Sequence, residues 1–156
     1  MKTWSRKPLI SALAATLVFV GTAAMAADGA NKDDAIAMVK KAVAFIKEQG
    51  PDKAYPEFTN KNPKFIDRDL YVVVYQLDGK VLAHGSNPKF VGKDMSDAQD
   101  VDGKLFVKER IEMAAKQPSF WQEYKFVDPT TKKVEPKEMY CERLDNTAVC
   151  AGIYKS

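Results

Sequence analysis

The sequence predicts an α+β domain in which helices pack on an antiparallel sheet. Two observations support this fold class. The periodic segments follow the order helix, two strands, helix, three strands, and the strands are joined by short links of the hairpin type, which make neighbouring strands antiparallel. With 156 residues, 46% of them hydrophobic and 29% charged, the chain suits one globular domain and not a disordered segment.

Residues 1–26 have the three parts of a cleavable signal peptide. The segment opens with three basic residues, Lys2, Arg6 and Lys7. An uncharged run follows, and Ala24-Met25-Ala26 forms a small-x-small cleavage site. We expect cleavage before Ala27, which would leave residues 27–156 as one mature domain. That domain would be periplasmic or secreted, would not insert into the membrane, and could form disulfides.

A retained leader is the alternative interpretation. The 18 uncharged residues from Leu9 to Ala26 approach the lower limit for a membrane-spanning helix. An uncleaved leader would therefore anchor the domain to the membrane.

The net charge of +3 says little about the mature domain. It arises from 24 basic and 21 acidic residues, and three of the basic residues lie in the leader. Without them the chain is formally neutral, which removes the composition argument for an anionic partner. We expect no nucleic-acid partner.

Residues 33–49 are predicted to form an amphipathic helix. Ile36, Val39, Val43 and Ile46 recur at helical spacing. Asn31 or Asp33 can cap its start, and Gly50-Pro51 ends it. We expect the following segment, 52–64, to be a polar connector with at most one short helical turn.

Leu70–Gln76 and Val81–Ser86 are predicted to form a hairpin, because Asp78-Gly79 separates two β-branched and aromatic runs. A two-residue loop would pair residues whose numbers sum to 157. Tyr75 would then face Leu82, Val73 would face His84, and Tyr71 would face Ser86. Alternation would place four aliphatic side chains on one face: Val72, Val74, Val81 and Ala83. The other face would carry Tyr71, Tyr75, Leu82 and His84.

A second helix is predicted over residues 104–116, and three strands follow it. Their predicted ranges are 120–127, 138–144 and 147–154. Asp128-Pro129-Thr130-Thr131 joins the first two strands, and Asp145-Asn146 joins the last two.

Cys141 and Cys150 are predicted to form a structural disulfide. A two-residue turn at Asp145-Asn146 places them opposite each other on a non-hydrogen-bonded pair, where Cα atoms approach to about 4.5 Å. A redox or metal site is the alternative, but the pair lacks Cys-x-x-Cys spacing and the one histidine is remote in sequence.

The sequence carries no recognised catalytic or cofactor motif. It lacks a Gly-rich phosphate loop, a Gly-x-Ser-x-Gly elbow and a His-Glu-x-x-His pair. One histidine cannot supply the usual multi-histidine zinc site. Asp100-Val101-Asp102-Gly103 matches half of a calcium loop but lacks the terminal Glu, so we expect a turn that caps the next helix. We therefore expect no enzyme activity, no cofactor and no metal.

His84 is the strongest candidate binding residue. Tyr71 and Tyr75 share its face, and small-molecule pockets combine aromatic walls with a few polar groups. The alternatives are a histidine bonded within the sheet and ordinary core tyrosines. Lys137 could pair with a ligand carboxylate, or it could be a solvated surface lysine. Trp121 and Tyr124 lie on opposite faces of their strand, so at most one of them shares the face of His84.

Eight short motifs, in order from Asp33 to Tyr154, resemble the single Cache domain (type 2). They are Ala42–Lys47, Asp69–Val74, Asp78–Gly85, Asn87-Pro88, Val91–Asp94, Asp100–Lys104, Lys137 with Tyr140, and Ala151–Tyr154. The resemblance implies a PAS-like Cache fold, with a long N-terminal helix packed on a five-stranded antiparallel sheet. It also implies an extracytoplasmic sensor with a ligand pocket on the other face. By position, the ligand-binding residues would be Tyr71, Tyr75, His84, Asp100, Trp121, Tyr124 and Lys137.

The leading hypothesis is an exported, stand-alone sensor domain for a small anionic metabolite, a carboxylate or an amino acid. Its signal would pass through a partner, a membrane receptor or a kinase. Two alternatives stay open. One is a protein–protein interaction or assembly domain without a small ligand. The other is a small exported hydrolase or isomerase that uses His84 as a base, oriented by Asp100 or Asp102.

Overall fold

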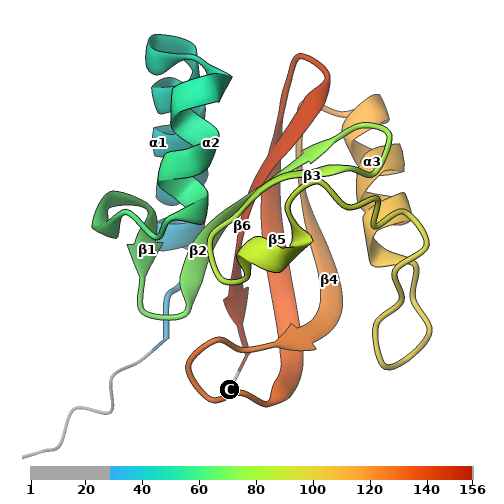
Figure 1. The fold of residues 1–156 in the computed structure, drawn as a ribbon. Coiled ribbons are helices and arrows are strands. Elements are labelled where there is room, and N and C mark those ends of the chain that lie inside the picture. Colours follow the sequence, from blue (N-terminus) through green and yellow to red (C-terminus); the bar gives the residue numbers. More distant parts are fainter. Residues whose placement is uncertain (1–28, 156) are drawn as a thin grey trace, which may run out of the picture.

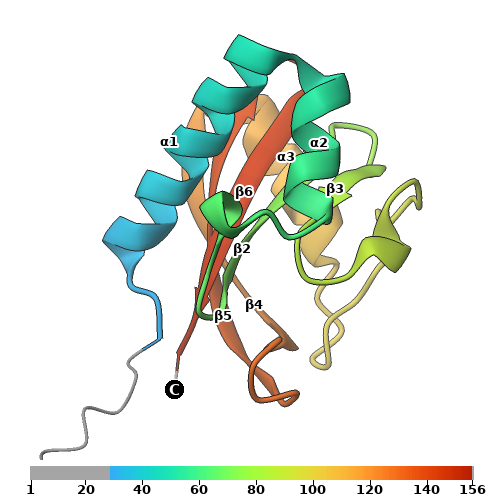
Figure 2. The same ribbon diagram turned by 60° about the vertical axis from the view of Figure 1, so that its left-hand side comes forward.

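Two helices cover one face of a twisted antiparallel sheet, and a third helix lies against the other face (Figure 1). The computed structural model describes residues 29–155, so the predicted signal peptide lies outside the described residues. Helices α1 (Lys32–Gln49) and α2 (Pro51–Thr59) cover the first face, and α3 (Phe106–Lys116) the second. Figure 2 shows α1 crossing the sheet over β5 and β6, with α2 beside β3.

Six strands form the sheet, in the order β1-β2-β6-β5-β4, with β3 on the same edge of β2 as β1. Their bounds are β1 Ile66–Asp67, β2 Leu70–Gln76, β3 Val81–His84, β4 Ser119–Val127, β5 Val134–Leu144 and β6 Thr147–Tyr154. The predicted α+β class and the five predicted strands are confirmed. The sixth strand, β1, has two residues, and no hydrophobic run in the sequence predicts it. Strand β5 begins four residues earlier than predicted, because Val134 still pairs with Val127 of β4.

The start of α1 follows from its capping residues. The Asn31 side chain accepts a hydrogen bond from the Asp34 backbone N–H (3.1 Å), and the Asp34 carboxylate accepts one from the Asn31 N–H (3.0 Å). This capping box satisfies two otherwise unpaired donors. Gly50, at φ 80°, ends the helix as predicted.

The buried stripe of α1 is rotated from the predicted one. Val39 and Ile46 are buried as expected, whereas Ile36 and Val43 lie at the half-buried margin. The remaining buried positions are Ala35, Met38 and Ala42. Small alanines let the helix approach the sheet closely, which a count of large apolar side chains does not reveal.

The polar connector predicted over residues 52–64 is wrong, because Pro51–Thr59 forms α2. Pro51 occupies the first turn, where a missing N–H costs nothing. Ala54 and Phe58 are fully buried beneath the helix. A short 3-10 turn, Pro63–Phe65, then leads into β1, and a second one, Pro88–Phe90, follows β3.

The β2–β3 hairpin departs from its predicted register near the turn. Val73 pairs with His84 as predicted, but a bulge after Val74 pairs Tyr75 with Val81 instead of Leu82. The loop has three residues, since Gln76 N–H donates to Lys80 O (2.8 Å) and Gly79 takes φ 102°.

The bulge also exchanges two side chains between the faces. Val81 joins Tyr71 and Tyr75 in the core on the α3 side of the sheet, whereas Leu82 packs on the side of α1 and α2. The predicted faces are therefore wrong at these two positions. Strand β3 ends at His84, so the predicted Tyr71–Ser86 pair does not form; instead Gly85 N–H donates to Val72 O (2.9 Å).

The β5–β6 hairpin has the predicted register throughout. Cys141 pairs with Cys150, with 4.1 Å between their Cα atoms, and the two form the predicted disulfide. Both cysteines are fully buried on the α3 side of the sheet.

We expect the Cys141→Ala/Cys150→Ala variant to be less stable than the oxidised protein by about 2–3 kcal/mol, because the disulfide limits the entropy of the unfolded chain. Urea unfolding of both proteins, with and without reductant, measures the difference. Reductant should destabilise only the wild type. An unchanged urea midpoint in the variant would contradict the structural role.

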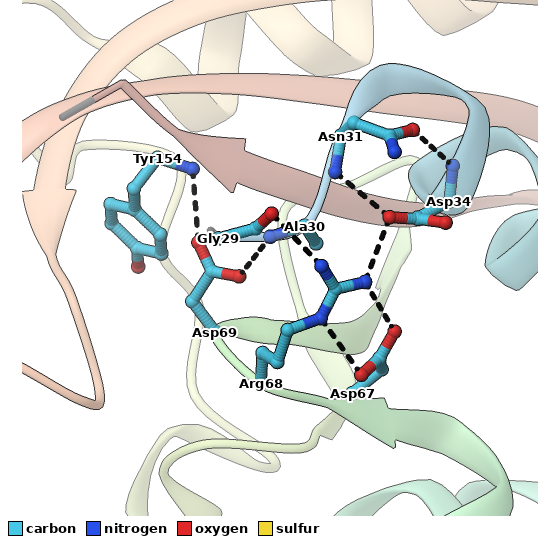
Figure 3. Close-up of polar contacts among 8 residues, drawn as sticks. All are labelled: Gly29, Ala30, Asn31, Asp34, Asp67, Arg68, Asp69 and Tyr154. Carbon is cyan, nitrogen blue, oxygen red and sulfur yellow. Dashed lines mark hydrogen bonds and ion pairs between the residues drawn. The ribbon is translucent and has the colours of Figure 1, made fainter. Parts of the chain in front are cut away.

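One buried carboxylate holds both ends of the described chain (Figure 3). Asp69 lies in the turn between β1 and β2 and is 5% exposed. Its Oδ1 accepts a hydrogen bond from Ala30 N–H (2.9 Å), and its Oδ2 accepts a long one from Tyr154 N–H (3.5 Å). The neighbouring Arg68 guanidinium donates to Gly29 O (3.0 Å) and to Asp34. The segment before α1 and the end of β6 are thus tied to the same turn.

Candidate ligand-binding site

The α3 side of the sheet contains a group of buried polar and aromatic side chains, here called the cationic cluster. Its members are Tyr71, Tyr75, His84, Arg110, Tyr124, Lys137 and Tyr154. Strands β2, β4, β5 and β6 supply the four tyrosines and Lys137 by alternation along each strand. His84 lies at the end of β3, and Arg110 comes from α3. Five of the predicted binding residues therefore meet in one place: Tyr71, Tyr75, His84, Tyr124 and Lys137.

Lys137 lies at the centre of this cluster and is 1% exposed. Its Nζ donates to Tyr71 Oη (2.8 Å) and Tyr154 Oη (3.1 Å), and lies 4.0 and 4.4 Å from the centres of those two rings. No carboxylate of residues 29–155 forms an ion pair with it. Burial, and then the charge of Arg110, lower the pKa of Lys137 well below its usual value. The surface-lysine alternative is excluded.

The tyrosines around Lys137 remain protonated. Burial raises the pKa of Tyr71 to about 12 and raises those of Tyr124 and Tyr154 further. Tyr154 Oη donates to Val127 O (2.8 Å) and lies 3.2 Å from Tyr71 Oη. Phenol groups therefore accept the hydrogen bonds of Lys137 Nζ without adding negative charge.

Arg110 is fully buried, and its guanidinium is only partly satisfied. Nε donates to Gln122 Oε1 (3.0 Å), and the guanidinium carbon lies 4.9 Å from the Tyr75 ring centre and 5.0 Å from that of Tyr124. Nη1 and Nη2 have no hydrogen-bond partner within 3.5 Å among residues 29–155, although Tyr124 lies near enough for Arg110 to oppose the rise in the Tyr124 pKa. An arginine stays charged in proteins, and each buried, unpaired donor costs about 1–3 kcal/mol or more. Among the described residues, this edge of the guanidinium is buried without a hydrogen-bond acceptor.

The hydrophobic pattern of α3, although it is not a recognised motif, could have identified Arg110 as a candidate site residue. It lies on the buried stripe of α3, with Phe106, Val107 and Ala114 at spacings of four, three and four residues. An arginine in the middle of an apolar helix face is either paired or functional, because burying an unpaired charge is costly.

His84 is a neutral donor in this cluster. It is 3% exposed, and its Nδ1 accepts a hydrogen bond from Asn87 N–H (3.1 Å), which leaves the proton on Nε2. Its ring lies 5.3 Å from that of Tyr71. Burial, and then the charges of Lys137 and Arg110, lower the pKa of His84 to about 3. The histidine is therefore uncharged at neutral pH.

This lowered pKa predicts an acid-sensitive fold. Between the unfolded pKa of about 6.5 and the folded value of about 3, the unfolded chain binds more protons, so stability falls as the pH falls. From pH 7 to pH 5 we expect a loss of about 2 kcal/mol. Urea unfolding at both pH values measures it. His84→Asn, which keeps an acceptor for Asn87 N–H, should remove most of this loss. An equal loss in that variant would contradict the assignment.

Two predicted residues lie outside the cationic cluster. Trp121 is on the other side of the sheet, with its ring 5.2 Å from that of Tyr140 and 5.0 Å from Lys32 Nζ. The Asp100 carboxylate accepts hydrogen bonds from the backbone N–H groups of Asp102, Lys104 and Lys125, which tie its loop to β4. Asp100 does not cap α3, whose N-cap, Leu105, makes no side-chain bond. Within residues 29–155, no group of three or more metal-ligating side chains is present.

A small surface depression of about 180 Å³ borders the cluster at Tyr71. Gly85 and Ser86, after β3, and Pro129 and Thr130, in the β4–β5 loop, line its sides. Its volume is below the roughly 300–1,000 Å³ of pockets for drug-sized ligands, and Tyr71 is the one member of the cationic cluster that lines it.

Comparison with known proteins places this fold in a family. A family model described as single Cache domain 2 matches residues 12–153, most of the chain. The chain belongs to the single Cache domain 2 family. No curated protein sequence matches it.

Solved Cache and sensor structures have the same fold as this Cache domain. A methyl-accepting chemotaxis protein from Vibrio parahaemolyticus superimposes with a TM-score of 0.68 at 22% identity, over 79% of this chain and 87% of that one. A Cache chemosensory domain, described for its carboxylic acid recognition, gives 0.70 at 17% identity, over 80% and 92%. The periplasmic sensor domain of a chemotaxis protein gives 0.63 at 20% identity, over 80% and 90%.

These likenesses confirm the predicted PAS-like Cache fold. Cache domains are extracytoplasmic sensor domains, and the solved structures named above are described as sensor or chemotaxis proteins, not as enzymes. In residues 29–155 of this Cache domain, no helix combines the length and the hydropathy that a membrane span requires.

Proposed function

We propose that this Cache domain binds a small carboxylate, with Arg110 as the main anchor and Lys137 and His84 as further donors. The observation that carries the proposal is the buried Nη1–Nη2 edge of Arg110, which has no partner among residues 29–155. Arginine presents two parallel N–H donors that match the two oxygens of a carboxylate.

Charge balance supports the same ligand class. Arg110 and Lys137 are close enough for the guanidinium to lower the pKa of Lys137. Neither forms an ion pair with a carboxylate of residues 29–155. At longer range, Asp69 and Asp128 partly oppose the lowering of the Lys137 pKa, and Glu109 interacts with the charge of Arg110. An anionic ligand would offset the cost of burying this positive charge. The aromatic rings beside Arg110 would contact an apolar ligand body.

One structural relative adds weight to this choice. It is the Cache chemosensory domain described for carboxylic acid recognition, although at 17% identity the likeness concerns the fold. We propose further that the domain acts after export and that ligand binding signals through a receptor or kinase partner.

The structure gives no support to the hydrolase alternative. His84 Nδ1 accepts the Asn87 N–H, so Nε2 carries the proton and has no lone pair with which to act as a base. The Asp100 carboxylate is occupied by backbone donors of its own loop and of β4.

A thermal-shift screen of the purified protein tests the proposal. Small carboxylates, amino acids and purines form the panel. A ligand that binds only the folded state stabilises it by about 2.7 kcal/mol at 100 times its dissociation constant. We expect a dose-dependent rise in Tm for carboxylates and none for purines. The absence of a shift across the panel would favour an assembly domain instead.

A further inference from the structure

Gln122 of β4 has its whole side-chain amide engaged by α3. It is 3% exposed. Its Oε1 accepts from Arg110 Nε (3.0 Å), and its Nε2 donates to Phe106 O (2.8 Å) and to Glu109 Oε2 (2.7 Å). The reverse amide orientation would place NH2 against an N–H donor and Oε1 against two acceptors. The amide can therefore hold Arg110 in only one way.

We propose that Gln122 is the positioning residue of the anion site, which fixes Arg110 so that only its Nη1–Nη2 edge can meet a ligand carboxylate. The identity of the ligand in this inference rests on the proposed carboxylate binding. The orientation of Arg110 by Gln122 does not depend on that proposal. An arginine can offer a carboxylate either its Nε–Nη2 edge or its Nη1–Nη2 edge. Because Gln122 occupies Nε, the first edge is closed.

Aromatic rings restrict the remaining motion of the guanidinium. Its central carbon lies 4.9, 5.0 and 5.5 Å from the ring centres of Tyr75, Tyr124 and Phe106. Because these rings come from β2, β4 and α3, they surround the group from several elements. A carboxylate would therefore bind end-on to a pre-oriented pair of donors, which lowers the entropy lost on binding.

Glu109 has a role in holding the Gln122 amide in place. Its carboxylate accepts from Gln122 Nε2 and pairs with Lys104 Nζ at 2.9 Å. Glu109 therefore holds the amide, and the Arg110 charge helps to lower the pKa of the Glu109 carboxyl although the two groups form no ion pair.

Nitrogen-15 NMR of arginine Nε–H groups tests the orientation in the ligand-free protein. Arg143 is the internal control, because its exposed Nε donates to Asp145 O (3.1 Å) at the surface. We expect the Arg110 Nε–H to exchange with water at least tenfold more slowly than that of Arg143, since it is buried and bonded to Gln122. Equal exchange rates in the wild type would overturn the proposal without any variant.

Two variants separate positioning from stability. Gln122→Met removes the acceptor at similar size and should reduce the exchange protection to what burial alone provides, whereas Gln122→Glu keeps the acceptor and should retain it. Gln122→Met should also weaken binding of straight-chain monocarboxylates of two to six carbons about tenfold, the effect of losing one orienting bond to a charged group. Gln117→Met, at an exposed position, is the matched control.

The possible results distinguish failure of the Gln122 positioning role from failure of the proposed carboxylate binding. Undiminished protection in Gln122→Met overturns the positioning role, as does unchanged affinity in a variant whose protection is reduced. If the wild type binds none of these monocarboxylates, the proposed ligand class fails, while the exchange data still decide whether Gln122 orients Arg110.

Discussion

Arg110→Met is expected to abolish carboxylate binding without lowering the stability of the ligand-free protein. The guanidinium would supply two hydrogen bonds to a charged ligand, each worth about 1.5–3 kcal/mol, so affinity should fall at least about 100-fold. The unliganded fold should roughly keep its stability, because methionine removes two unpaired buried donors but leaves Gln122 Oε1 without its partner. Isothermal calorimetry and urea unfolding measure the two effects.

Arg143→Met is the matched control for this substitution. Arg143 is exposed and lies at the far end of β5, so its removal should leave carboxylate affinity unchanged. The opposite pattern, a destabilised Arg110→Met variant that still binds carboxylates, would mean that Arg110 has a structural role alone.

Gly152→Ala is expected to cause the largest loss of stability among single methyl additions near the cluster. A Cβ at this position of β6 would lie 2.8 Å from Glu138 O, 2.8 Å from Lys137 Cε and 3.0 Å from Met139 Cα. Two of these atoms belong to the backbone of β5 and cannot move without disturbing the sheet. We expect a loss of about 3 kcal/mol, at the upper end for overpacking, together with displacement of Lys137. Urea unfolding measures the loss.

A double variant tests the cause of that loss. Lys137→Ala removes the Cε contact but leaves the two backbone contacts. The combined substitutions should therefore destabilise by less than the sum of the single effects, as expected for groups in contact. Full additivity would show that Gly152 and Lys137 do not compete for the same space.

Alternation along the strands accounts for what the sequence could predict. Period-two spacing brought Tyr71 and Tyr75 onto the face of His84 and separated Trp121 from Tyr124, as the structure confirms. The two-residue Asp145-Asn146 turn set the entire β5–β6 register. The β2–β3 register failed beside its turn, because a three-residue loop and a bulge are compatible with the same Asp-Gly signal.

Other features depended on contacts between distant residues. A proline inside a segment, such as Pro56, disfavours a helix, but burial of Ala54 and Phe58 stabilises α2 around it. Arg110 was missed because a charged residue in a helix is usually solvated. The apolar stripe of α3 indicates burial of this side chain, and the packing of α3 on the sheet shows which rings surround it.

Asp100 illustrates a different limit of the sequence. An acidic residue in a Gly-containing loop can bind a ligand, or it can accept hydrogen bonds from nearby backbone N–H groups, and the sequence pattern is the same in both cases. The three backbone donors that occupy its carboxylate, one of them from β4, cannot be read from the loop itself.

The central claim is that the unpartnered guanidinium edge selects a carboxylate, and paired ligands test it most directly. Calorimetric titration of the purified protein at neutral pH would compare straight-chain monocarboxylates of two to six carbons with the primary amides of the same lengths. We predict saturable binding of at least one carboxylate and none of its amide, because a neutral amide cannot offset the charge of Arg110. Equal binding of acid and amide, or binding of neither at any length, would contradict the account.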